Sequence, residues 1–299
     1  MGVVAPILGD ALADIARDVD RLFDTLLPVP KDQRAPLFEA MRHASIGGGK
    51  RLRPLLVVAS CALFNVDRAA ALRVGCAVEA IHVYSLIHDD LPCMDDDDMR
   101  RGKPTVHKAF TEAIAVLAGD SLHALAFELV VDEAVNTDPF VRIELAEGLA
   151  RASGPSGMAG GQMMDIAAET QTFDLNGVTR LQQMKTGALI AFSVEAGAIM
   201  GRVPPEGRAA LRGYARDVGL AFQIADDLLD EEGDEELAGK ALHKDAAAGK
   251  ATFLSLLGVD RARAQAQMLV NQAISHLNSF GEEAELLRAI ARYSIERDR

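Results

Sequence analysis

Two clusters of aspartates, each directly after an apolar segment, have the residue types and spacing that point most clearly to chemistry. The first cluster has six aspartates from Asp89 to Asp98, and the second consists of Asp226, Asp227 and Asp230. Carboxylates packed this closely repel one another unless cations neutralise them. Oxygen ligands suit hard divalent cations, and magnesium typically takes one or two carboxylates together with substrate phosphates. The two clusters therefore predict a magnesium site for a phosphorylated substrate.

The second cluster has the spacing of a helix face. Asp226 and Asp230 are four residues apart, so an α-helix places both carboxylates on one face, and Gln223 shares that face. The calcium-loop pattern D-x-[DN]-x-[DN]-G-x5-E does not occur in the sequence, which disfavours a calcium buffer. The pattern therefore favours magnesium over calcium.

The first cluster has no single regular spacing. On an ideal helix Asp89 would align with Asp96 and not with Asp95, but Pro92 lies between them and should distort the helix. Spacing alone therefore leaves open which of the two aspartates faces Asp89. His88 beside this cluster would also suit a helical His-Asp metal phosphohydrolase, but a site of that kind needs several histidine ligands.

Two short basic segments supply the positive charge that a metal–diphosphate site also needs. One follows a run of three glycines, and the other follows the first aspartate cluster. Their cations are Lys50, Arg51 and Arg53 in the first segment, and Arg100, Arg101 and Lys103 in the second. The arginine fork suits phosphate oxygens, and lysine adds a mobile point charge. The glycine run does not fit a Walker loop, and no strand precedes it.

The elements that must position these residues are predicted to be helices. Ala, Leu, Glu, Arg and Met fill long stretches, and alternating strand patterns are scarce. Apolar residues recur at spacings of three and four in the segments 7–27, 34–45, 54–64, 68–90, 107–134, 139–152, 174–200, 205–230, 260–279 and 281–296. No stretch reads as a flexible linker. We therefore predict an all-α protein whose helices form a single large domain over residues 1–299.

Composition restricts the class of protein further. Of the 299 residues 49% are hydrophobic and 25% are charged, and 31 Lys+Arg against 44 Asp+Glu give a formal net charge of −13. This acidic balance argues against a nucleic-acid partner. No apolar run approaches the roughly 20 residues that span a bilayer, so we expect no permanent membrane anchor. The three cysteines cannot all pair within the chain and are typical of a reduced, cytoplasmic protein.

Five motifs, in order along the chain, resemble those of the trans-polyprenyl diphosphate synthases, and most of all those of the bacterial farnesyl diphosphate synthases. They are GGKRLRP at 48–54, DDLPCMD at 89–95 with RRG at 100–102, GGQMMD at 160–165, KTG at 185–187, and FQIADDLLD at 222–230. Five ordered motifs make a specific match, whereas any one alone would not. The resemblance implies a fold of the isoprenoid synthase type, with about ten or more helices around a central active-site cavity.

The resemblance also implies an activity and roles for individual residues. The family joins isopentenyl diphosphate to an allylic diphosphate with the help of magnesium, about three ions in all. The implied metal ligands are Asp89, Asp95, Asp226 and Asp230, so the family pattern selects Asp95. The implied isopentenyl diphosphate ligands are Lys50, Arg53, His82 and Arg101. The implied allylic diphosphate ligands are Arg100, Lys185, Lys240 and Lys250, with Thr186 and Gln223 beside the developing cation.

Product length is a separate question, and Tyr84 bears on it. Tyr84 lies five residues before Asp89, about 7.5 Å along a helix, so its ring could form a floor that stops chain elongation. An aromatic residue there, with Pro92 and Cys93 inserted between the aspartates, resembles the farnesyl diphosphate synthases. We therefore expect farnesyl diphosphate as the product.

Two alternatives to this interpretation are a geranylgeranyl diphosphate synthase of the same family and a catalytically silent helical partner subunit. Relatives that form geranylgeranyl diphosphate commonly carry a smaller residue at the position of Tyr84. A silent subunit should lack one carboxylate cluster or the basic residues, and both are present here. The resemblance further implies a homodimer.

Overall fold

The computed structural model describes residues 6–232 and 251–296, and the structural statements below concern these residues. Lys240 and Lys250, which we expect at the allylic diphosphate, lie outside them. The helices are α1 (Pro6–Leu26), α2 (Ala35–Ser45), α3 (Leu52–Ala62), α4 (Arg68–Asp89), α5 (Val106–Ala109), α6 (Glu112–Val131), α7 (Pro139–Ser153), α8 (Met158–Ala167), α9 (Leu175–Gln182), α10 (Ala188–Met200), α11 (Ala209–Glu232), α14 (Phe253–Leu257), α15 (Val259–His276) and α16 (Glu285–Glu296).

Shorter elements complete the chain. A π-helix, η1 (Gln183–Gly187), joins α9 to α10, and two short 3-10 helices are η2 (Pro205–Arg208) and η3 (Glu282–Ala284). In the described residues the strands are β1 (Met99–Arg100) and β2 (Lys103–Pro104), which pair antiparallel as a small ribbon. The predicted all-α fold with ten or more helices is therefore confirmed.

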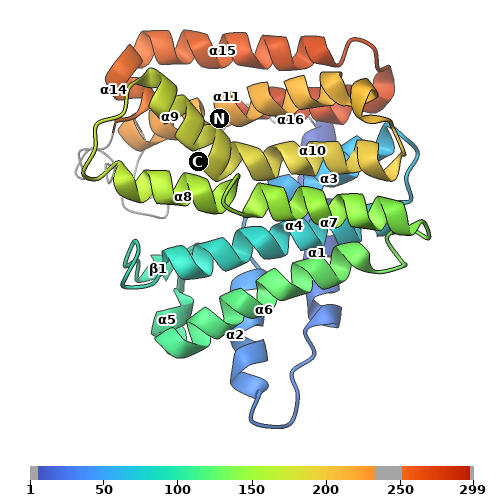
Figure 1. The fold of residues 1–299 in the computed structure, drawn as a ribbon, viewed down its shortest axis with the longest axis vertical. Coiled ribbons are helices and arrows are strands. Elements are labelled where there is room, and N and C mark those ends of the chain that lie inside the picture. The colour runs from blue at the N-terminus through green and yellow to red at the C-terminus, as the bar shows by residue number, and fades with distance from the viewer. Residues whose placement is uncertain (1–5, 233–250, 297–299) are drawn as a thin grey trace.

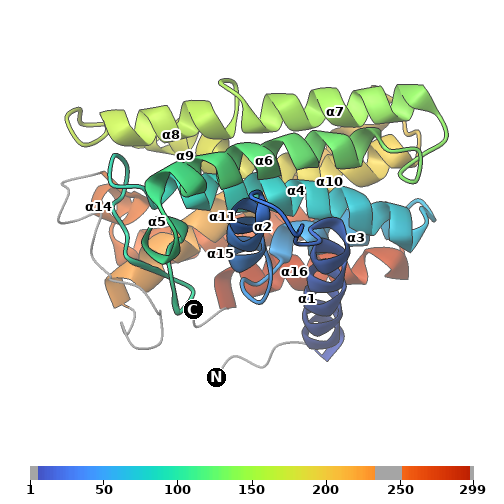
Figure 2. The same ribbon diagram turned by 90° about the horizontal axis from the view of Figure 1, so that it is seen from below.

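Most of the helices run side by side in layers. Figure 1 shows α10, α11 and α15 running across the molecule, whereas α1 and α2 run roughly perpendicular to them. Seen from below, α7 and α8 form the outermost layer on one side, with α15 and α16 towards the opposite side (Figure 2). The ribbon of β1 and β2 lies at the same end of the molecule as α14 (Figure 1).

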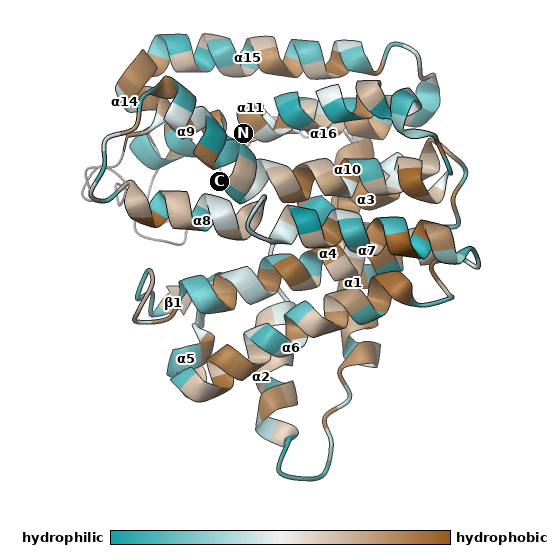
Figure 3. Cartoon of the chain, in the orientation of Figure 1, coloured by the Kyte–Doolittle hydropathy of each residue, from teal (hydrophilic) through white to brown (hydrophobic). Residues whose placement is uncertain are grey.

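A single cluster of buried apolar side chains fills the space between these layers. It includes residues from Leu8 on α1 to Ala291 on α16. Helix α10 packs against α3, and α3 packs against α4. Most of α10 is buried, and its ribbon is largely brown in Figure 3. A helix that is apolar on every side belongs inside a large core, and α10 is such a helix.

Helices α4 and α6 are long and apolar enough to cross a membrane by length and composition alone. A buried core helix of a soluble protein passes the same test. In α4, 67% of the apolar window is buried, as expected for a core helix, against 39% in α6. Helix α6 instead exposes apolar side chains such as Val116 and Leu117.

The structure differs from the sequence prediction in several places, including α14 and the ribbon of β1 and β2, which were not predicted. The helix predicted at 107–134 is interrupted after α5, because the Thr111 side chain accepts the backbone N–H of Ile114 and starts α6 anew. The helix predicted at 174–200 contains the π-helix η1. Helix α8 was not predicted, because the glycines at 154 and 157 and the pair at 160–161 favour a loop.

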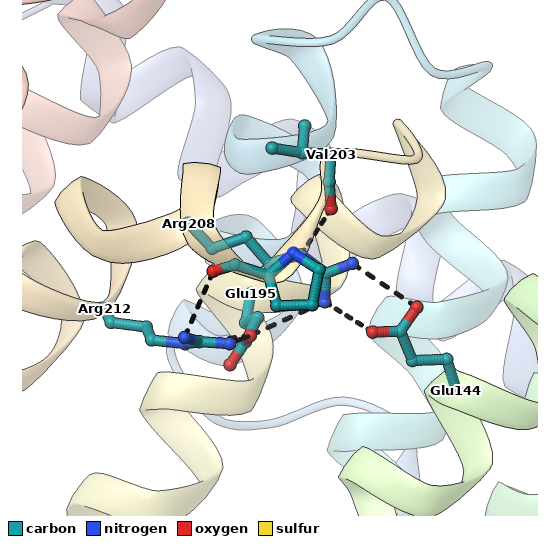
Figure 4. Close-up of polar contacts among 6 residues, drawn as sticks. Glu144, Glu195, Val203, Arg208 and Arg212 are labelled. Atoms are coloured by element: carbon teal, nitrogen blue, oxygen red, sulfur yellow. Dashed lines mark hydrogen bonds and ion pairs between the residues drawn. The ribbon is translucent and has the colours of Figure 1, made fainter.

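A network of ion pairs ties α7, α10 and the start of α11 together (Figure 4). The side chain of Arg208 is 5% exposed and pairs with Glu144 of α7 at 2.6 Å. Arg212 pairs with Glu195 of α10 at 2.6 Å, and Arg208 also donates to the carbonyl oxygen of Val203 at 2.6 Å. Arg208 is the buried member of the network, whereas the side chain of Glu144 is 42% exposed. Removing Glu144 would take away the main counter-charge of a buried guanidinium group, so the network helps to fix these helices relative to one another.

Candidate active site

The first aspartate cluster begins where α4 ends. Helix α4 ends at Asp89, three residues before Pro92, which has no N–H for a helical hydrogen bond. The chain then turns back, and the backbone N–H of Asp95 donates to the carbonyl oxygen of Asp89 at 2.8 Å. Asp96 takes a left-handed φ of +49° in this turn. The structure therefore brings Asp95 beside Asp89, because the helix that would align Asp96 has already ended.

The side chain of Asp89 is held close to other charges. Its pKa is raised to about 6, chiefly by burial and also by the negative charge of Asp95, against the opposing effect of Lys185 and Arg100. Burial and the neighbouring carboxylate therefore disfavour the ionised form of Asp89. A divalent cation beside Asp89 and Asp95 would supply that charge.

The π-helix η1 places Lys185 and Thr186 next to each other on the way into α10. The ammonium group of Lys185 pairs with Asp165 of α8 at 2.8 Å. Helix α8 comes this close because of Gly161, where a β-carbon would lie 2.1 Å from the backbone nitrogen of Lys185. The π-helix is a rare geometry that is often found at functional sites. Here it holds Lys185 near Asp89 and Thr186 near α11.

A short chain of hydrogen bonds links Thr186 to the second aspartate cluster. The Thr186 hydroxyl donates to the side-chain carbonyl oxygen of Gln223 at 3.2 Å, and the amide nitrogen of Gln223 donates to Asp226 at 3.1 Å. Gln223 is 9% exposed, so its two bonds fix its orientation. Asp230 follows Asp226 by one turn of the same helix.

Among the described residues no group of three or more His, Cys, Asp or Glu side chains converges as a complete metal site. The two clusters nevertheless fit magnesium, because that ion needs only one or two carboxylates when substrate phosphates complete its shell. Both clusters also lie towards helix C-termini, at the end of α4 and in the last turns of α11. The negative pole of each helix adds to the carboxylate charge there and favours a cation.

The opposite side of the site gathers positive and neutral donors from three elements. Arg53 belongs to the first turn of α3, His82 to α4, and Arg101 to the turn between β1 and β2. Burial, with the charges of Arg53 and Arg101, lowers the pKa of His82 well below its usual value, so the imidazole is neutral at pH 7. Burial also lowers the pKa values of both arginines, and their proximity adds to the effect.

The guanidinium groups of Arg53 and Arg101 have few hydrogen-bond acceptors around them in the described residues. The Nε atom of Arg53 is buried without a hydrogen-bond partner. In the part of the chain that is described, neither Arg53 nor Arg101 forms an ion pair with a carboxylate. Close cations that form no ion pair in the described residues, near the positive N-terminal pole of α3, form a ready binding site for a phosphate group.

The glycine run shapes this basic side. Gly49 has φ +82°, and a β-carbon there would lie 2.6 Å from the guanidinium carbon of Arg101. Only glycine therefore lets Arg101 lie directly over the loop. Lys50 follows with its side chain exposed. The loop and the ribbon turn thus bring Lys50, Arg53 and Arg101 to one region, as the resemblance implies.

Two arginines of the basic segments behave differently from the rest. Arg51, which the sequence groups with Lys50 and Arg53, is buried and pairs with Glu79 at 2.6 Å. Arg100 donates to Asp90 at 2.6 Å and to Asp97 at 3.3 Å, so carboxylates already occupy part of its guanidinium group.

Sequence reasoning missed two carboxylates that position site residues. Asp165 holds Lys185, and Glu79 holds Arg51. Asp165 ends the motif at 160–165, and Glu79 is a lone acid in an otherwise apolar stretch of α4. An acid in a buried helix segment usually has a paired partner, which is the signal that could have identified Glu79.

Tyr84 and His88 face α6 from the last turns of α4. The ring of Tyr84 makes edge-to-face contacts with His88 and His123, with centroid distances of 5.7 and 4.9 Å. A ring nitrogen of His88 lies 3.2 Å from the carbonyl oxygen of Val116. His88 is therefore engaged in the contact between α4 and α6, which disfavours the His-Asp phosphohydrolase alternative.

Comparison with known proteins agrees with this geometry. The family model described as "Polyprenyl synthetase" matches residues 34–292. The chain is 43% identical over 265 residues to a farnesyl diphosphate synthase of Geobacillus stearothermophilus, covering 88% of this chain and 89% of that protein. It is 44% identical over 272 residues to geranylgeranyl pyrophosphate synthase 11, chloroplastic, of Arabidopsis thaliana, covering 89% and 76%. A crystal structure of an FPP/GFPP synthase from Zymomonas mobilis is 64% identical, with a TM-score of 0.90 over 96% of this chain and 98% of that one.

The substitution Arg53→Gln should separate binding from stability. Removing a buried charge that has no partner should leave the free energy of unfolding unchanged or raise it. The loss of a charged hydrogen-bond donor, about 1.5–3 kcal/mol, should weaken the binding of inorganic diphosphate about tenfold or more. Titration calorimetry with magnesium present and denaturant unfolding measure the two quantities. Arg151→Gln, which removes an exposed arginine, is the control and should change neither. A variant that unfolds more easily yet binds diphosphate normally would contradict this view of Arg53.

Proposed function

Because this chain belongs to the polyprenyl synthetase family, we propose that it is a magnesium-dependent prenyltransferase. It condenses isopentenyl diphosphate head to tail with dimethylallyl diphosphate and then with the geranyl diphosphate so formed, or with geranyl diphosphate directly. Each condensation releases one diphosphate, and the product is farnesyl diphosphate. The observation that carries this proposal is the pairing of two unlike surfaces in one site. The guanidinium groups of Arg53 and Arg101 form no ion pair in the described residues, and Arg53 lies within electrostatic range of Asp226 in the second carboxylate cluster.

The basic surface is the proposed site for isopentenyl diphosphate. Arg53 and Arg101 offer guanidinium donors to the diphosphate, and Lys50 adds a third positive charge. His82 is neutral there, so it donates one N–H without adding charge. Neutral His82 also avoids further repulsion among the arginines.

The acidic surface is the proposed site for the allylic diphosphate. Asp89, Asp95, Asp226 and Asp230 would hold magnesium, with about three ions in the loaded enzyme. Lys185 and Arg100 lie near Asp89 and would contact the same diphosphate. Lys240 and Lys250 complete the predicted set but fall outside the described residues.

The chemistry begins when the allylic carbon–oxygen bond breaks and leaves a carbocation and a diphosphate anion. Magnesium, when bound, neutralises the charge that develops on this leaving group. Lys185 adds a fixed positive charge, which Asp165 holds in place. The Thr186 hydroxyl and the Gln223 amide present neutral dipoles that stabilise the cation without attacking it.

The new bond forms when the double bond of isopentenyl diphosphate attacks the cation. Loss of a proton from the adduct then restores an alkene. In this proposal the released diphosphate accepts that proton, and the residues of the basic surface keep the second substrate oriented throughout.

An elongation assay tests the proposed function. The purified chain is incubated with magnesium, isopentenyl diphosphate and each allylic primer, and product chain length is read by chromatography. We expect farnesyl diphosphate with either primer and no product when a chelator removes magnesium. A chain that yields no elongation product with any primer is not this enzyme, which would favour the silent subunit. A geranylgeranyl product would keep the reaction and change the assigned length.

In this proposal, product length depends on whether the ring of Tyr84 is held rigidly enough to block a prenyl tail that extends from Asp89 along α4. Its ring is half-buried and packs between His88 and His123, so α6 braces it from behind. A braced ring can stop a growing prenyl tail at a fixed depth. Farnesyl and geranylgeranyl synthases both occur among the relatives at similar identity, so the residues of this floor carry the assignment of farnesyl diphosphate.

The substitution Tyr84→Ala should therefore lengthen the product. Loss of the ring opens space along α4, and we expect geranylgeranyl or longer products to become the major species. Product profiles by chromatography measure the shift. Tyr293→Ala on α16 removes a second partly buried tyrosine and should leave the profile as it is. An unchanged profile for Tyr84→Ala would show that another residue sets the length.

We also propose that the protein is a cytoplasmic homodimer whose contact covers the exposed apolar face of α6 and α7. Val116 and Leu117 of α6 are 42% and 54% exposed, and Phe140 and Ile143 of α7 are 79% and 61% exposed. Helices α6 and α7 pack against each other, so these side chains lie on neighbouring elements. An apolar area of this kind is typical of a surface that another protein covers.

Light scattering should therefore give twice the mass of one chain. After lysis without detergent we expect the protein in the high-speed supernatant. Leu117→Asp should convert it to a monomer, because a buried charge without a partner opposes association. Met268→Asp on α15 is the control, since it charges an exposed methionine outside this face. Sedimentation of the wild-type chain with the membranes would instead assign the face to lipid.

A further inference from the structure

We propose that Arg51 is a positioning residue for the isopentenyl diphosphate site and does not bind substrate. Its guanidinium group is held by Asp20 of α1 and Glu79 of α4, and this clamp sets the direction of Lys50 and Arg53 on either side. The inference rests on the proposed function of the basic surface. It makes helix α1, which carries none of the predicted site residues, part of the substrate-binding apparatus.

The clamp is a buried ion triad. The side chain of Arg51 is 1% exposed and that of Glu79 is 2% exposed. One terminal nitrogen of Arg51 pairs with Glu79 at 2.6 Å, and the other pairs with Asp20 at 2.7 Å. That second nitrogen also donates to the backbone carbonyl of Ser45. These three bonds engage both terminal nitrogens, and the side chain of Arg51 is buried, so it points into the protein and not towards a phosphate in the site.

The same triad fixes the backbone of the glycine loop at both ends. The second carboxylate oxygen of Asp20 accepts the backbone N–H of Gly47 at 3.1 Å, while its first oxygen holds Arg51. Arg51 itself has φ +51°, a left-handed conformation that is unusual for a residue other than glycine. Such a conformation persists when surrounding contacts impose it, and here the ion pairs to α1 and α4 do so.

The geometry of this turn explains why the side chain of Arg51 points in a different direction from those of Lys50 and Arg53. Because Arg51 turns into the core, Lys50 before it and Arg53 after it are left on the side of the site. Glu79 has a further effect, since its negative charge also favours the charged forms of Arg53 and Arg101. One buried carboxylate thus anchors the loop and partly offsets the repulsion among the arginines that bind substrate.

The substitution Asp20→Asn tests the inference. Asparagine keeps an oxygen for the N–H of Gly47 but loses the ion pair to Arg51, and Asp20 is 32% exposed, so the chain should still fold. We expect the KM for isopentenyl diphosphate to rise about tenfold, with the KM for the allylic diphosphate and kcat within about twofold of wild type. Glu79→Gln should give the same split. Arg51→Lys, which keeps the positive charge, should retain part of the affinity for isopentenyl diphosphate but should not exceed that of the wild type.

Asp18→Asn is the matched control. It removes the same charge two residues earlier on α1, where Asp18 pairs with Arg68 at 2.6 Å on the surface, and should leave both KM values unchanged. Equal rises of both KM values in Asp20→Asn, or a lower melting temperature with normal KM values, would overturn the positioning role.

A second readout separates this inference from the proposed function. If the wild-type chain elongates no primer, calorimetric titration with inorganic diphosphate still compares wild type with Asp20→Asn. Weaker binding by the variant alone supports the clamp even though the enzyme assignment has failed. Equal affinity of the two proteins overturns the clamp whatever the assay of elongation gives.

Discussion

The structure depends on keeping opposite charges in one region of the molecule from pairing with each other. Carboxylates lie towards the C-termini of α4 and α11, and guanidinium groups lie at the N-terminus of α3 and on the ribbon turn. In the described residues no ion pair joins Arg53 or Arg101 to Asp89 or Asp226. Had these groups paired with each other, their charges would attract neither a divalent cation nor a phosphate as strongly. The helix poles reinforce each sign, and the packed core holds the two surfaces apart.

That separation is maintained by ion pairs placed just outside the reacting groups. Asp165 holds Lys185 from α8, Glu79 and Asp20 hold Arg51, and Asp90 holds Arg100. In each of these ion pairs, a carboxylate is neutralised by the basic side chain whose position it fixes. The carboxylates that contribute to the net charge of −13 therefore include two kinds, those that would bind cations and those that orient basic side chains.

Particular residues show how far sequence reasoning reaches. The spacing of Asp226 and Asp230 and the periodicity of α4 and α11 follow from local helix geometry, and the structure has these helices. The choice between Asp95 and Asp96 does not, because it depends on where α4 ends and on one backbone hydrogen bond to Asp89. The π-helix is equally hidden, since residue propensities do not distinguish it from an α-helix.

The sequence by itself determined the helical class, the two acidic clusters, the basic segments and the family resemblance, because all of these are encoded in residue type and short-range spacing. The tertiary structure decided which charges remain available. Lys50, Arg51 and Arg53 look alike in sequence, yet Arg51 is consumed by Asp20 and Glu79, which are 31 and 28 residues away along the chain. Burial and long-range pairing set the charge state and direction of a side chain, and neither can be read from its neighbours in sequence.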